Sequence, residues 1–144
     1  MANKDAPFGL KPIGKVGQNR DNQGLSEYDI AASATAIYFN DPVKMKNDGT
    51  IEVAGAGGAI LGSLNGVFFT DATTSKPTFA NHLNASNTAT DIVGFISDDP
   101  YERFEIQTNN TGASAKTDIF NVADIEYTAG SSPDFVSAVE LNDS

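Results

Sequence analysis

The sequence predicts a mainly β protein: a small antiparallel β-barrel or β-sandwich with one short helix and an extended N-terminal arm. Short segments alternate polar and apolar residues with the two-residue period of strands. Glycine, asparagine and aspartate stand at near-regular breaks between them, as in all-β domains. Two prolines and four glycines interrupt the first 24 residues. We therefore expect residues 1–24 to form the arm and residues 25–144 to form one folded body.

The N-terminal arm is expected to be extended, because its prolines and glycines exclude a helix. It carries the spaced apolar residues Phe8, Leu10, Ile13 and Val16. Such a segment cannot build a core of its own, so these side chains are expected to be buried against something else. The alternative is a disordered chain end, which is common in proteins.

The first half of the body reads as short strands and one hairpin. Strands are expected at residues 26–30, 36–39, 42–45 and 50–53. The last two are joined through Asn47-Asp48-Gly49. Asp-Gly between alternating apolar segments is a strong hairpin signal, because both central residues of a type I′ turn need positive φ. The sequence therefore predicts a hairpin with a type I′ turn here.

The second half of the body continues with strands and contains the one helical candidate. Further strands are expected at residues 59–63, 66–70, a short stretch beginning at Phe79, 91–96, 103–108 and 135–141. The strands at 91–96 and 103–108 are expected to pair with each other. Residues 81–90 are polar and expected to be exposed. The helix is expected over 114–125, with an apolar face formed by Ile119, Phe120, Val122 and Ile125.

The last expected strand, 135–141, places Phe135, Ser137, Val139 and Leu141 on one face, which should be buried. A strand near a chain end needs a partner, since exposed edges invite wrong pairing. The partner is expected to be another strand of the body, a neighbouring copy or another protein.

Composition narrows the functional classes. The chain has no cysteine, which excludes disulfides and thiol chemistry. Its net charge of −10 opposes binding to nucleic acid, whose affinity for proteins comes mainly from lysine and arginine. No signal peptide is expected, and nothing approaches the roughly 18 consecutive apolar residues of a membrane span. We expect synthesis in a cytoplasm, with no membrane partner.

The charge is unevenly distributed. Residues 1–20 contain four basic side chains and one acidic side chain, a net of +3, whereas the rest of the chain holds five basic and 18 acidic groups, a net of −13. A basic segment attached to an acidic body suggests that the arm has a partner of its own.

Catalytic and cofactor motifs fail on inspection. His82 is the only histidine and lies in a polar stretch without a nucleophile elbow, so it is interpreted as a surface residue. The stretch from Gly55 to Gly62 lacks the spacing of a dinucleotide fingerprint. Asp98, Asp99 and Glu102 lack the pattern of a calcium loop and are assigned a structural role. We expect no enzymatic activity, no cofactor and no metal.

Several motifs resemble a known family. The opening Met1-Ala2-Asn3-Lys4-Asp5-Ala6-Pro7-Phe8-Gly9-Leu10-Lys11-Pro12-Ile13 resembles the start of tailed-bacteriophage head cement or decoration proteins, encoded beside the major capsid protein. The similarity continues through Asn40-Asp41-Pro42-Val43, Ile60-Leu61-Gly62, Gly66-Val67-Phe68-Phe69-Thr70-Asp71, Asp98-Asp99-Pro100 and Val139-Glu140-Leu141. The arm is less basic here than in some relatives. Relatives also continue past the last motif with another apolar strand, so either the C-terminus is shortened here or the full product is longer.

The resemblance implies a non-enzymatic virion protein on the outer capsid surface of an HK97-type head, made in the cytoplasm of a bacterial host. Its partner would be the major capsid protein, which it would cement. The capsid-binding residues would be Lys4, Phe8, Leu10, Lys11, Ile13 and Lys15. By analogy with other head decoration proteins a homo-oligomer is expected, a homotrimer before a dimer.

Three rival functions are weighed against the cement protein. A lectin-like, host-surface-binding protein would show clustered surface aromatic residues, but Phe68, Phe69, Phe95 and Phe104 are interpreted as core. A head-associated hydrolase is opposed by the missing catalytic groups. A neck or tail component is compatible with the composition, and copy number per virion would distinguish it.

Overall fold

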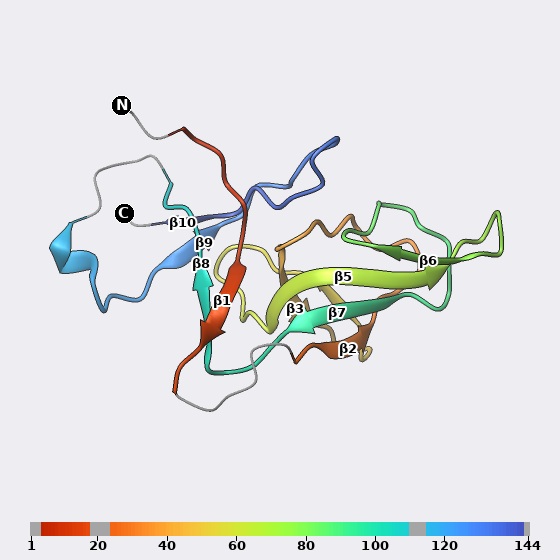
Figure 1. Cartoon of the computed structure of the whole chain (residues 1–144), viewed down its shortest axis with the longest axis horizontal. Helices are drawn as coiled ribbons and strands as arrows, with labels where there is room; N and C mark the ends of the chain where they lie inside the picture. Colours follow the sequence, from red (N-terminus) through yellow and green to blue (C-terminus); the bar gives the residue numbers. More distant parts are fainter. Residues whose placement is uncertain (1–3, 18–23, 110–114, 143–144) are drawn as a thin grey trace.

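The computed structural model describes residues 4–17, 24–109 and 115–142 (Figure 1). Its largest sheet is built from β2 (Ser26–Asp29), β3 (Pro42–Met45), β4 (Ile51–Val53), β5 (Gly62–Thr70), β6 (Pro77–Ala80) and β7 (Val93–Ser97). Two separate ribbons pair β1 (Lys11–Lys15) with β8 (Glu102–Glu105) and β9 (Asp124–Glu126) with β10 (Glu140–Asn142).

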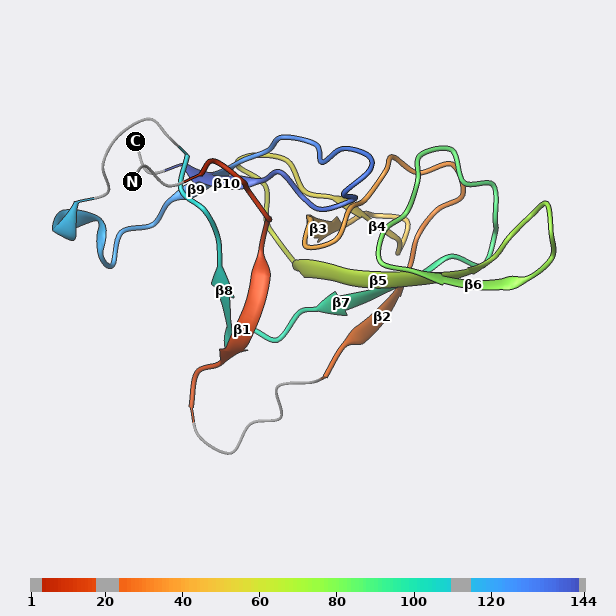
Figure 2. The ribbon, with the colours of Figure 1, turned by 45° about the horizontal axis from the view of Figure 1, so that its top comes forward.

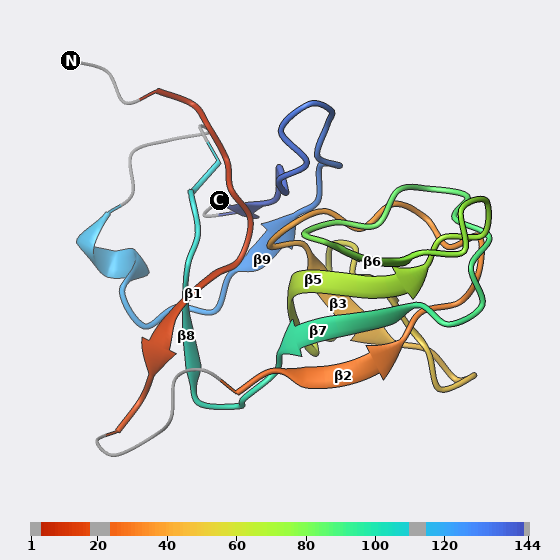
Figure 3. The ribbon, with the colours of Figure 1, turned by 45° about the vertical axis from the view of Figure 1, so that its right-hand side comes forward.

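The main sheet has the strand order β2-β7-β5-β3-β4, and β6 also pairs with β5. All of these pairs are antiparallel. Figure 3 shows β6, β5, β7 and β2 lying side by side. The prediction of a mainly β fold is confirmed and is consistent with a sandwich. The closed barrel is wrong, because the strands in the described ranges form an open sheet and two ribbons.

The hydrophobic core lies between one face of the main sheet and the long loops that cover it (Figure 2). Its buried members are Ile30, Ile37, Val43, Ile51, Leu64, Val67, Leu83, Ala89, Ile92 and Ile96. Strand residues supply one side of this core, and the loops around Ile37 and Leu83 supply the other. Burial of a leucine or isoleucine side chain contributes roughly 1.5–3 kcal/mol. The stretch 81–90, expected to be exposed, therefore helps to close the core through Leu83 and Ala89.

The central strand β5 replaces two expected strands. Residues 59–63 and 66–70 were expected to be separate, with a turn between them. Instead β5 runs unbroken from Gly62 to Thr70, and its pairing with β7 shifts between Leu64 and Gly66. The exposed Asn65 is the extra residue of this bulge, which lets Leu64 and Val67 both face the core. The turn signal in Asn-Gly thus marks a bulge.

The hairpin between β3 and β4 is confirmed, but its turn differs from the expected type. Lys46 N donates to Thr50 O at 2.8 Å, and Gly49 N donates to Lys46 O at 3.2 Å. Gly49 has a φ of +85°, whereas Asp48 lies outside the positive-φ region. This is a three-residue loop with glycine in the left-handed position rather than a type I′ turn.

The expected helix over 114–125 is wrong for the residues that the structure describes. A single 3₁₀ turn, Lys116–Asp118, is followed by β9. Ala115 offers no side-chain cap, and β-branched residues in this stretch favour strands. Ile125 is buried, but it is buried as a strand residue opposite Leu141 of β10.

Two expected pairings also differ. The strands expected at 91–96 and 103–108 do not pair with each other: β7 lies between β5 and β2, and β8 pairs with β1. Residues 36–39 make isolated bridges through Ile37 and Phe39 rather than a strand. The C-terminal strand is shorter than expected, at Glu140–Asn142, and its partner is β9 of the same chain. Ser137 and Val139 are buried, as expected.

Candidate functional site

The N-terminal segment is part of a β-ribbon in this chain. β1 pairs with β8 so that Lys11 lies opposite Glu105 and Lys15 lies opposite Glu102, with an irregularity between Pro12 and Gly14. Figures 1 and 2 show this ribbon beside the main sheet and outside it. Residues expected to seek a partner outside the chain thus have a partner within it along one edge of β1.

Two lysines of the expected capsid-binding set are engaged in ion pairs. Lys11 Nζ lies 3.1 Å from Glu105 Oε2, and both side chains are more than half exposed. Lys15 Nζ lies 3.0 Å from Asp99 Oδ2, and the Lys15 side chain is only 9% exposed. An exposed pair such as the first contributes little to stability. Lys11 can therefore exchange its partner readily, whereas Lys15 is held by the body.

The expected apolar anchors divide in the same way. Leu10 is buried at 8% exposure, whereas Ile13 is 55% exposed. Phe8 is half-buried, and the Lys11 ammonium lies 6.0 Å from the centroid of its ring. Lys4 is exposed. Of the six residues, Lys4, Lys11 and Ile13 are thus open to a partner.

A tight turn at residues 38–41 fixes both ends of the chain to the sheet. The buried Asn40 donates from Nδ2 to Phe8 O at 3.1 Å, and its own carbonyl accepts from Leu10 N at 2.9 Å. Its backbone N donates to Leu64 O of β5. Phe39 exchanges backbone hydrogen bonds with the segment at Phe135 and Ser137. The turn therefore sets where the ribbon leaves the body.

Asp41 ends this turn with a fully buried carboxylate. Its Oδ2 accepts a 2.7 Å hydrogen bond from Tyr38 N, while Oδ1 has no hydrogen-bond partner in the described residues. Burial raises the pKa of Asp41 above its usual range, although hydrogen bonds from Ser137 and Tyr38 oppose that shift. Asp41 is therefore a buried acid whose charged form is disfavoured.

The acidic corner between β7 and β8 has a structural role. Asp98 accepts hydrogen bonds from Ser26 Oγ at 2.8 Å and from Tyr28 Oη at 2.6 Å. The hydrogen bond to Asp98 raises the pKa of Tyr28. Glu102 Oε1 accepts from Gly14 N at 3.1 Å. Together with the Lys15–Asp99 pair, these contacts join β1 and β2 to the corner, as the sequence interpretation assigned.

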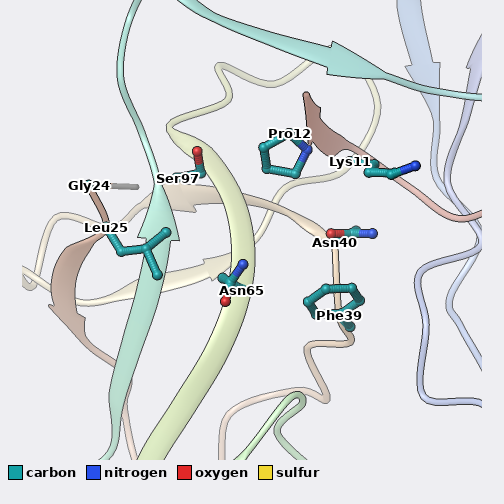
Figure 4. Close-up of a pocket in the computed structure, with 8 residues that line it drawn as sticks. All are labelled: Lys11, Pro12, Gly24, Leu25, Phe39, Asn40, Asn65 and Ser97. Atoms are coloured by element: carbon teal, nitrogen blue, oxygen red, sulfur yellow. The ribbon is translucent and has the colours of Figure 1, made fainter. Parts of the chain in front are cut away.

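A cleft of about 390 Å³ lies where the ribbon meets the main sheet. Figure 4 shows Lys11 and Pro12 on one side and Leu25 on the other, with Asn40 and Asn65 between them. The lining combines apolar surface with two amides and one ammonium. It is suited to an extended backbone, which offers the hydrogen-bonding groups that amides satisfy.

The ribbon also carries exposed apolar side chains. Ile13 and Val16 are each 55% exposed, and Tyr101 is 51% exposed. Val16 N donates to Tyr101 O at 2.8 Å, so these two residues are neighbours. Tyr101 was noted in the sequence only as an isolated candidate, because its nearness to Val16 depends on the β1–β8 pairing. We call Ile13, Val16 and Tyr101 the apolar ribbon surface.

A second surface was missed by sequence reasoning. Phe68 and Phe95, interpreted as core, lie on the sheet face opposite the core, where Phe79 is 74% exposed. The Phe68 and Phe79 rings lie 4.7 Å apart, and those of Phe79 and Phe95 lie 6.5 Å apart. We call these three residues the aromatic face. Phe69 packs against the core, as expected.

His82 is not the exposed residue that the sequence suggested. Its ring stacks on Phe135, with centroids 4.0 Å apart and planes 6° apart, and the Tyr38 ring lies 6.4 Å away. Burial lowers the pKa of His82. The neighbours come from distant segments, so this packing has no local sequence signal.

The described residues hold no group of three or more acidic, histidine or cysteine side chains arranged to bind a metal. None of the helical segments in the described ranges has the length and hydrophobicity that crossing a membrane requires.

Comparison with known proteins adds no family: no family model matches the chain, no curated protein matches it, and no solved structure matches its fold.

Proposed function

We propose that this chain is a non-enzymatic structural protein of a tailed bacteriophage virion, which binds the outside of the capsid and cements neighbouring capsomers. The major capsid protein is its partner. The proposal rests on the family resemblance of the sequence motifs and on one structural observation, the apolar ribbon surface. Synthesis takes place in the bacterial host cytoplasm.

The apolar ribbon surface carries the proposal because the ribbon has the properties of a strand-adding element. A two-stranded ribbon has outer edges with backbone groups directed away from its own pair, and such edges are templates for pairing with another chain. Ile13, Val16 and Tyr101 add apolar side chains to this element, which supplies side-chain contacts beside the backbone contacts. Lys11 adds a cation held only by an exposed ion pair.

The acidic body complements this role. Excluding Lys4 to Arg20, the chain is strongly acidic, which suits a surface that faces solvent. A stable specific interface buries about 1,200–2,000 Å² in total. The apolar ribbon surface is too small to supply that area alone, so the cleft at Lys11 and Leu25 is proposed to accept an extended capsid segment alongside it.

Binding to expanded heads that lack this protein tests the proposal. Purified wild-type chain is expected to co-sediment with such heads to saturation. Ile13→Ser combined with Val16→Ser should weaken binding at least tenfold without loss of the β circular-dichroism spectrum, since both side chains are exposed. Met45→Ser is the matched control, because Met45 is 62% exposed on the β3–β4 hairpin away from the ribbon. Heads that bind none of the wild-type chain would contradict the proposed function.

Two alternatives have distinct signatures. The aromatic face satisfies the criterion set for a lectin-like protein, a cluster of surface aromatic residues, so glycan-array binding that depends on Phe79 would favour that function. A neck or tail component would be present in small numbers set by tail symmetry. Quantitative mass spectrometry of virions should instead give copies in the hundreds, which scale with capsid subunits.

A further inference from the structure

One end of the molecule carries an apolar tip. Just after the 3₁₀ turn, Phe120 and Val122 are fully exposed, at 101% of their reference area, and Ile119 is 56% exposed. Phe120 has a φ of +73°, a conformation that bulky residues rarely adopt. Single exposed apolar residues need no explanation, but three within four residues form a patch of the kind that marks interaction sites. We call residues 119–122 the apolar finger.

The aromatic face is the second uncovered apolar feature of the chain. Directly opposed residues on neighbouring strands share a face, and Phe68 lies opposite both Phe79 of β6 and Val93 of β7. Phe95 follows Val93 on the same face of β7. The core lies on the other face of these strands. Aromatic residues gathered in this way are typical anchors at interface centres.

The two features lie at opposite ends of the molecule. Figures 1 and 2 show the segment that contains the finger at one end of the long axis and β6 near the other. A finger therefore cannot cover the aromatic face of its own chain. We infer that the apolar finger of one copy docks on the aromatic face of the next copy, in a head-to-tail contact between identical chains.

The dimensions of the two surfaces support a second copy as the occupant. The finger is a short projection with three apolar side chains, and the aromatic face is a patch of three rings. Each is small compared with a standard protein interface. In a head-to-tail assembly every chain uses both surfaces, so the two small contacts add, and a rotation that closes makes a ring.

The charges beside the two surfaces are arranged for the same contact. Glu27 of β2 lies opposite Phe95, and Asp29 lies opposite Val93, so two exposed carboxylates border the aromatic face. The exposed Lys116 lies at the base of the finger. A head-to-tail contact can bring this ammonium toward those carboxylates. Pairing of two aromatic faces would instead place carboxylates of two chains, each with a net charge of −10, near one another.

Disulfide trapping between two single-cysteine chains tests this contact without any capsid, so its outcome is independent of the proposed function. The chain has no native cysteine, which makes each introduced thiol unique. Asn121→Cys places a thiol in the finger. Pro77→Cys places one on the exposed side of β6, two residues before Phe79. When the two chains are mixed and oxidised, the mixed disulfide is expected to form at least fivefold faster than in a mixture of Asn121→Cys with Met45→Cys.

Two further substitutions keep the test decisive. Adding Phe120→Ser to the finger chain, or Phe79→Ser to the face chain, should abolish the rate excess, and circular dichroism should show that both variants remain folded. Sedimentation of the wild-type chain should show concentration-dependent association that Phe120→Ser removes. Equal trapping rates with Pro77→Cys and Met45→Cys would overturn the inference. So would a chain that stays monomeric and binds a glycan or capsid protein through Phe79.

Discussion

Asn40 holds the backbone of Phe8 in place through its side chain, with Nδ2 donating to Phe8 O at 3.1 Å, although 32 residues separate the two. The Asn40 backbone carbonyl accepts from Leu10 N, so the two contacts flank Gly9. Asn40 also has a φ of +66°, a region that asparagine tolerates better than most residues. One residue thus satisfies both a conformational and a hydrogen-bonding requirement where the N-terminal segment joins the body.

Replacing Asn40 should therefore loosen the N-terminal segment. Asn40→Gly keeps the φ requirement satisfied but removes the donor to Phe8 O, and leaving a buried acceptor unpaired costs about 1–3 kcal/mol. We expect a loss of this size in the free energy of unfolding, measured in urea, together with faster proteolysis near Lys11. Asn65→Gly is the control, because Asn65 is exposed on β5. Equal effects of the two substitutions would contradict the role assigned to Asn40.

Gly9 provides a second test of the same junction. A Cβ atom at Gly9 would lie 2.4 Å from Asn40 O and 2.4 Å from Ser137 Cβ, so the backbone or its neighbours must shift. Gly57 has nearly the same φ, +69° against +71°, with no atom within 4 Å of its Cβ position. Gly57→Ala measures the conformational cost alone. Gly9→Ala should cost about 1–3 kcal/mol more, the usual penalty of overpacking, in the free energy of unfolding.

These contacts show where sequence reasoning succeeded and where it stopped. Local patterns located β2, β3, β4 and β7 within about two residues, because alternation and turn residues act locally. The pairing of β1 with β8 joins segments about 90 residues apart, which no local pattern encodes. The arm was therefore expected to wait for an external partner, although its own chain supplies one for Leu10 and Lys15.

The aromatic face was missed for a related reason. Phe68 and Phe69 are adjacent in a strongly apolar strand, so periodicity alone could not say which of them faces the core. The bulge at Asn65 decides this by shifting the alternation, which sends Phe69 inward and Phe68 outward. Phe79 then meets Phe68 only because β6 folds back on β5.

Asp41 should make stability depend on pH in a specific direction. Because burial raises its pKa in the folded state above the usual 3.8, the folded chain holds this proton more tightly than the unfolded chain. Its contribution is thus fully present below pH 3.8 and is lost as the pH rises through the raised pKa. Asp41→Asn removes this titration, so the stability difference between variant and wild type should shift in favour of the variant as pH rises through that window.

The comparison must be made as a difference, because other groups titrate in the opposite sense. Hydrogen bonds from Thr50 lower the pKa of Asp48 to about 2, so its contribution is present above pH 3.8 and lost as the pH falls toward 2. Asp48→Asn should remove that opposite dependence. Unfolding curves of wild type and Asp41→Asn that stay parallel from pH 3.5 upward would show that Asp41 ionises freely in the fold.

His82 should contribute to stability through its ring. Stacked on Phe135 with centroids 4.0 Å apart, it makes an aromatic contact of a kind that contributes about 0.5–1.5 kcal/mol. His82→Ala should lower the free energy of unfolding by at least this amount at pH 8, whereas His82→Phe should retain most of it. Because burial lowers the pKa of His82, the unfolded chain binds its proton more tightly. Wild-type stability should therefore fall as the pH drops below 6.5, and His82→Phe should lack that part of the decrease. Denaturation at pH 8 and pH 5.5 measures both effects, and a His82→Ala chain as stable as wild type would show that the stack contributes nothing.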